Sequence, residues 1–107
     1  MRIEVLYFDG CPGHEALLPR LREILARTGV STEIDLRRIE NDEVAQRERF
    51  LGSPTVRVDG RDIEPEADRR TDYGLKCRLY VAPTGLSGEP DDELLRAALR
   101  SAAGAIA

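Results

Sequence analysis

Hydrophobic positions along the chain change their period several times, and each change marks an expected element. Residues 2–8 form a nearly continuous apolar run of β-forming residues, which predicts a central strand buried on both faces. Over residues 14–28, leucine and isoleucine recur on one helical stripe, and Gly29 supplies a stop. Pro19 inside this helix predicts a kink. Residues 30–37 then alternate apolar and polar side chains, as in a half-buried edge strand.

The second half of the chain continues with a helix, a hairpin and a final helix. Asn41 is a typical N-cap, so we expect a helix from there to about residue 50. Asp59-Gly60 lies between two short β-prone runs and predicts a hairpin over residues 53–63. Residues 77–81 have the composition of a short extra strand in a stretch that otherwise favours loop. A last helix begins at residues 90–93.

These elements follow the order β-α-β-α-β-β-α. Two strands that flank a helix are expected to be parallel with a right-handed crossover, and the hairpin adds an antiparallel pair. We therefore expect an α/β fold with a four-stranded mixed sheet flanked by helices on both faces. Residues 1–107 make one domain, with an extra loop segment at about residues 65–89.

Charge and composition narrow the possible partners. Sixteen basic and 20 acidic side chains give a net charge of −4, which argues against nucleic acid or an anionic membrane as a partner. The chain opens on a strand pattern rather than a secretory leader, and no run reaches the ~20 apolar residues of a membrane span, so we expect a cytoplasmic protein. Nothing in the pattern calls for a cofactor, and the oligomeric state is not indicated.

Two cysteines carry the candidate chemistry. Cys11 lies in a Gly- and Pro-rich turn between the first strand and the first helix, where a helix N-terminus favours the thiolate. Such a turn rarely buries a side chain, so we interpret Cys11 as a reactive nucleophile rather than as a small core residue. Cys77 is either its resolving partner, which requires Cα atoms within ~7 Å, or a core residue of the short strand. Spacing leaves both open.

His14 follows Cys11 by one helical turn. If protonated, it would favour the Cys11 thiolate, and it could also act as an acid or base, bind a metal, or simply occupy the first helical turn. Together with Cys77, these side chains are chemically suited to a soft metal such as zinc, copper(I) or mercury.

Three landmarks resemble the thioredoxin/glutaredoxin-like superfamily: Cys11 between a strand and a helix, Pro19 inside that helix, and Ser53-Pro54-Thr55-Val56 at the third strand. The resemblance covers about residues 2–63 and the final helix. It implies a minimal thioredoxin-like fold in which Pro54 is cis and lies beside the nucleophile Cys11. A late Gly-x-x-Cys-Arg segment, with Cys77 as its cysteine, is similar to that of short thioredoxin-like proteins.

The resemblance also implies a set of site residues. The usual Cys-x-x-Cys motif is here Cys11-Pro12-Gly13-His14, so His14 stands where a second cysteine would be. The likeness makes Cys11 the nucleophile, and together with the chemistry of the residues themselves we expect Cys11, His14 and Cys77 to be the catalytic residues. Its substrate-binding residues are Pro12, Gly13, Ser53, Pro54 and Thr55.

Three functions follow, in decreasing order of support. The first is a thiol–disulfide redox protein in which Cys11 attacks a disulfide of a protein or a low-molecular-weight thiol, and Cys77 or external glutathione resolves the mixed disulfide. The second is a thioredoxin-fold protein that binds a partner without redox chemistry. The third is a soft-metal binder that uses Cys11, His14 and Cys77.

Overall fold

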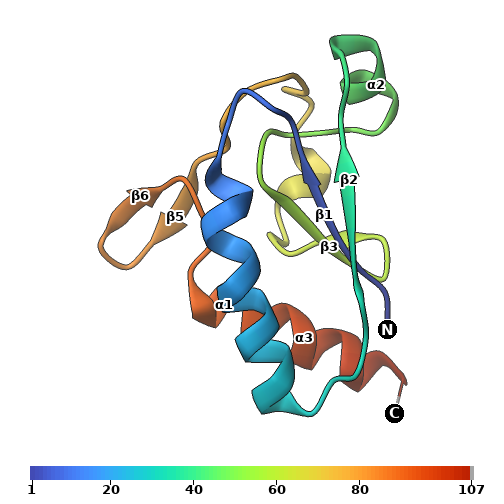
Figure 1. Cartoon of the computed structure of the whole chain (residues 1–107), viewed down its shortest axis with the longest axis vertical. Helices are drawn as coiled ribbons and strands as arrows, with labels where there is room; N and C mark the ends of the chain where they lie inside the picture. Colours follow the sequence, from blue (N-terminus) through green and yellow to red (C-terminus); the bar gives the residue numbers. More distant parts are fainter. Residues whose placement is uncertain (107) are drawn as a thin grey trace.

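A four-stranded mixed sheet in the order β2-β1-β3-β4 forms the centre of the computed structural model, which describes residues 1–106 and their side chains through residue 103 (Figure 1). β1 (Ile3–Tyr7) pairs in parallel with the edge strand β2 (Ile34–Arg38). On its other side it pairs antiparallel with β3 (Thr55–Val58), which forms a hairpin with β4 (Arg61–Asp62). The central first strand, the parallel first pair and the hairpin are therefore confirmed.

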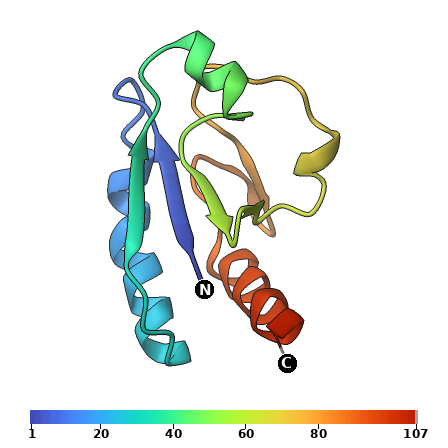
Figure 2. The ribbon, with the colours of Figure 1, turned by 90° about the vertical axis from the view of Figure 1, so that its right-hand side faces the viewer.

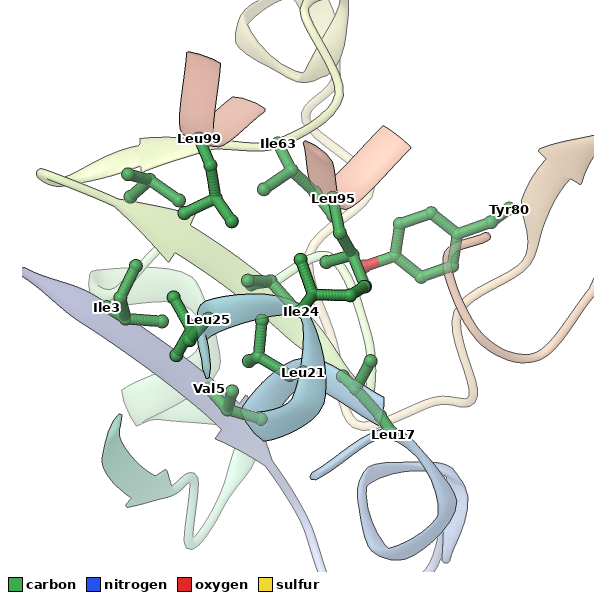
Figure 3. Packing of buried hydrophobic residues seen from close by; sticks show 12 residues of the cluster. Ile3, Val5, Leu17, Leu21, Ile24, Leu25, Ile63, Tyr80, Leu95 and Leu99 are labelled. Atoms are coloured by element: carbon green, nitrogen blue, oxygen red, sulfur yellow. The ribbon is translucent and has the colours of Figure 1, made fainter. Parts of the chain in front are cut away.

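Two helices cover one face of the sheet. α1 (Gly13–Thr28) connects β1 to β2, and α3 (Asp92–Ile106) packs beside it. Side chains at helical spacing on α1 meet inward-facing side chains of β1, as Figure 3 shows, and β3 contributes two valines to the same cluster. The buried cluster consists of Ile3, Val5, Leu17, Leu21, Ile24, Leu25, Val56, Val58, Ile63, Tyr80, Leu95 and Leu99.

The third helix, α2 (Asp42–Arg47), lies at the end of the sheet where β1 and β2 finish, far from α3 (Figure 2). Leu6 of β1 packs into its small cluster, on the face opposite Val5, because successive strand residues point to opposite faces. Asn41 caps α2, accepting the Val44 N–H at 2.9 Å. Helices thus lie on both faces, as expected.

Two of the expected boundaries are wrong at α2 and β2. α2 was expected to reach about residue 50 but ends at Arg47, because Arg49 adopts a φ of 56°, outside the helical region. β2 begins at Ile34 rather than at residue 30. The alternation of side chains starts earlier than the pairing with β1, whose register begins with Ile3 opposite Ile34.

The segment between the hairpin and α3 contains more structure than expected. It holds a short 3-10 helix (Ala67–Arg69) and a separate two-stranded sheet of β5 (Tyr80–Ala82) and β6 (Gly85–Ser87). The strand expected at residues 77–81 therefore starts late, and β6 lies where only loop was expected. In Figure 1 the β5–β6 hairpin stands apart from the main sheet, beside α1. Across residues 1–106, no helix has the length and apolar character needed to cross a bilayer.

Candidate functional site

A disulfide joins Cys11 to Cys77, which lie 66 positions apart in the sequence. Their Cα atoms are 5.7 Å apart, within the range that a disulfide requires. The pairing that sequence spacing left open is therefore present, and it links the start of α1 to the segment that precedes β5. This bond is the centre of the candidate site.

Cys11 occupies the turn between β1 and α1. Its N–H donates to the Phe8 carbonyl at 3.3 Å, and Pro12, which is exposed, precedes the first residue of α1. We expected an exposed cysteine in this turn, but Cys11 is only 6% exposed. The reason is that its Sγ lies 3.6 Å from the Ser53 carbonyl oxygen and bonds to Cys77, so later segments of the chain cover it.

Gly13 allows these segments to approach the start of α1. A Cβ added to Gly13 would lie 3.2 Å from both Pro54 Cδ and the Gly88 carbonyl oxygen, and 3.9 Å from Cys11 Sγ. Distances of 3.2 Å are tighter than ordinary van der Waals contact. A side chain at this position would therefore push the proline loop or the β5–β6 hairpin away from the disulfide.

Both backbone polar groups of Ser53 bond to the segment that carries Cys77. The Ser53 N–H donates to the Lys76 carbonyl at 2.8 Å, and the Ser53 carbonyl accepts the Arg78 N–H at 2.9 Å. This gives an isolated parallel bridge between Ser53 and Cys77. We call residues 76–78 the cysteine segment. The Ser53–Pro54 peptide bond is cis, as the resemblance implied.

The side chains around this bridge are buried. Ser53 and Thr55 were expected to bind substrate. Both are 0% exposed, so their side chains are turned into the protein. Thr55 Oγ1 donates to the Gly52 carbonyl at 2.6 Å, and Tyr80 Oη donates to the Pro54 carbonyl at 2.5 Å. Burial raises the pKa of Tyr80 far above its ordinary value, so its hydroxyl remains a donor.

Arg78 anchors the cysteine segment to the body of the protein. Its fully buried guanidinium donates to Asp62 at 2.7 and 2.9 Å and to Glu64 at 2.6 Å. It also donates to Thr55 Oγ1 at 3.2 Å and lies 4.6 Å from the centre of the Tyr80 ring. Burial alone would lower the pKa of Arg78, but the hydrogen bonds that its guanidinium donates to the Asp62 and Glu64 carboxylates outweigh that effect and raise the pKa.

Gly52 packs closely against the same segment. It has a φ of 123°, and an added Cβ would lie 3.0 Å from both the Lys76 carbonyl oxygen and Arg78 Cβ. From the sequence, no functional role was assigned to Gly52, Arg78, Asp62 or Glu64. The available signal was the arginine directly after Cys77, together with the two acids spaced two residues apart at the end of the hairpin.

The His14 side chain contacts Tyr7 and the backbone of Cys11. Its ring stacks on Tyr7 with 4.1 Å between ring centres, and Nδ1 lies 3.3 Å from the Cys11 carbonyl oxygen. Asp9, which would oppose a thiolate at Cys11 if it approached the sulfur, bonds instead to Arg38 at 2.8 Å. Within the part of the chain that the structure describes, there is no group of three His, Cys, Asp or Glu side chains placed to hold a metal ion.

Known proteins add no family assignment to these observations. The chain matches no protein-family model, no curated protein and no solved structure. A function therefore has to be inferred from the disulfide, the start of α1 and the cysteine segment.

Proposed function

We propose that the chain is a thiol–disulfide redox protein with a thioredoxin-like fold, in which Cys11 and Cys77 alternate between a dithiol and a disulfide. The single observation that carries this proposal is the bond between them, placed at the start of a long helix and beside Pro54. The strand–helix–strand unit, the antiparallel β3–β4 pair and the proline directly before β3 support the fold part of the proposal.

The chemistry is a two-electron exchange with a substrate that contains a disulfide. One protein thiolate attacks the substrate disulfide, a mixed disulfide forms, and one substrate thiolate leaves. The other protein thiolate then attacks the mixed disulfide and releases the second substrate thiolate. The dithiol is oxidised to the Cys11–Cys77 disulfide, and the substrate is reduced to two thiols that take up the two protons.

The surroundings suit exchange better than a purely structural link. Cys77 is exposed, so an external thiol can meet the bond without unfolding the protein. The helix α1 has Pro12 at its N-cap and no side-chain hydrogen bond there, so its positive end is available to a thiolate at Cys11. The partner class is a protein or a low-molecular-weight thiol or disulfide.

Titration of both cysteines across glutathione redox buffers tests this proposal. Free thiols are alkylated after equilibration and counted by the intact mass of the protein. We expect one reversible transition in which both thiols disappear together, while circular dichroism shows that the protein stays folded. The Cys77→Ser variant is the matched control and should show no such intramolecular transition. Two thiols that titrate independently, or a bond that opens only on unfolding, would contradict a redox function.

A further inference from the structure

The two halves of the disulfide differ in their access to solvent. Cys11 keeps 6% of its exposure, whereas Cys77 is exposed. An incoming thiolate can only attack a sulfur that it reaches, and the attacked sulfur becomes part of the mixed disulfide while the other sulfur leaves. The unequal burial therefore determines which cysteine carries the substrate.

The segment that covers Cys11 is held in place by contacts other than the bond between the two sulfurs. The cysteine segment is held by its two backbone hydrogen bonds to Ser53 and by the buried Arg78 guanidinium on Asp62 and Glu64. None of these contacts involves a sulfur atom, so reduction leaves them in place. Cys11 thus stays covered and Cys77 stays outside in the dithiol form.

The start of α1 makes the covered Cys11, rather than the exposed Cys77, the better leaving group. Cys11 lies just before the helix, whose first-turn N–H groups and positive end stabilise a thiolate. A stabilised thiolate is a good leaving group when the bond to Cys77 is attacked. The covered sulfur is therefore the better leaving group, and the exposed sulfur is the one that an external reagent meets.

We propose that Cys77 is the cysteine that exchanges with external thiols and disulfides, and that Cys11 is the covered resolving cysteine. This assignment rests on the proposed redox function and reverses the roles that the sequence resemblance implies. The Cys77 thiolate attacks a substrate disulfide, a Cys77–substrate disulfide forms, and a substrate thiolate leaves with the electron pair of the broken bond. The Cys11 thiolate then attacks Cys77 Sγ, the protein disulfide forms, and the second substrate thiolate leaves.

The same geometry favours a small substrate. Both backbone groups of Ser53 are already bonded to the cysteine segment, so they cannot pair with an extended polypeptide beside the disulfide. A low-molecular-weight disulfide needs only the exposed Cys77. Glutathione disulfide is therefore the probe for the test.

Two single variants, Cys11→Ser and Cys77→Ser, separate the two roles. Each reduced variant is mixed with excess glutathione disulfide, quenched with acid at increasing times, and followed by the intact mass of the mixed disulfide. We expect the Cys11→Ser protein, which keeps Cys77, to react at least about tenfold faster than the Cys77→Ser protein. In concentrated urea the two rates should become similar, because the difference comes from the folded cover over Cys11. Circular dichroism checks that both variants are folded.

The outcomes distinguish this assignment from the redox function itself. A wild-type protein that exchanges with glutathione disulfide, combined with equal rates or a faster Cys77→Ser variant, would overturn the assignment and leave the redox function intact. A folded wild-type protein whose disulfide does not exchange, with neither variant captured, would overturn both.

Discussion

Reduction of the Cys11–Cys77 disulfide should lower the free energy of unfolding by about 4 kcal/mol. The bond closes a loop between residues 66 positions apart. In the chain-entropy treatment, a link across a loop of this size removes conformational freedom from the unfolded chain that is worth about 4 kcal/mol at room temperature. The folded state should change little, because the hydrogen bonds of the cysteine segment are made by backbone groups and by Arg78.

Urea unfolding with and without a strong reductant measures this difference. Far-ultraviolet circular dichroism is the appropriate signal, since the chain has no tryptophan. The cross-linked unfolded chain is more compact, so the oxidised protein should also show a smaller dependence on urea. A protein with both cysteines replaced by serine is the control, and its stability should equal that of the reduced wild type and ignore the reductant.

The same free energy must reappear in the reduction potential. By the thermodynamic cycle, a bond that stabilises the fold by about 4 kcal/mol is harder to reduce in the folded protein than in the unfolded chain by roughly 90 mV. Glutathione titrations in buffer and in concentrated urea measure the two potentials. A reduced protein as stable as the oxidised one would refute the expected stabilisation of the fold by the disulfide. So would a difference in reduction potential that disagrees, beyond error, with the difference in unfolding free energy.

Three further expectations concern the contacts around the site. Replacing Arg78 by alanine removes the fully buried partner of the partly buried Asp62 and Glu64 carboxylates and should lower the free energy of unfolding in urea by about 3–5 kcal/mol. The control Arg27→Ala, whose pair with Glu23 is largely exposed, should cost under about 1 kcal/mol. Burial raises the pKa of Tyr80, so this hydroxyl stays protonated in the folded protein but ionises at about pH 10 in the unfolded chain. The free energy of unfolding should therefore be highest below about pH 10 and decrease above it. In an alkaline titration, one of the three tyrosines should show tyrosinate absorbance only when the protein unfolds. Gly52→Ala should lower the free energy of unfolding by about 1–3 kcal/mol, because alanine is strained at the φ of 123° and its Cβ would meet the cysteine segment. The control Gly88→Ala, whose Cβ would meet nothing within 4 Å, should change the free energy measured by thermal unfolding by less than about 0.5 kcal/mol.

Local patterns were sufficient for the elements that hold the main sheet. The apolar run of β1, the helical stripe of α1 and the Asp59-Gly60 turn each carry their signal within a few residues, and all three are confirmed. The helix α2 ends early and β6 was missed, because both depend on short stretches whose conformation is decided by neighbours. Arg49, with its positive φ, illustrates this, since nothing in its side chain favours that conformation.

The site itself depends on contacts that sequence patterns do not encode. The partners of Arg78 are Asp62 and Glu64, but 16 basic and 20 acidic side chains allow many other pairings. Only the packing of the cysteine segment onto Ser53 selects this one. The prediction that Cys11 is exposed was wrong for the same reason. The composition of its turn says nothing about the segment more than 60 residues later that covers Cys11.

The position one helical turn after Cys11 lies in the first turn of α1 and carries no sulfur. Here that position holds His14, which stacks on Tyr7 and faces the Cys11 carbonyl. The partner sulfur is supplied by the exposed Cys77, which lies outside the helix on the segment that the buried Arg78 anchors. Cys77 is therefore exposed, whereas Cys11 is covered. This difference in exposure is the physical reason to expect Cys77 to meet the substrate first.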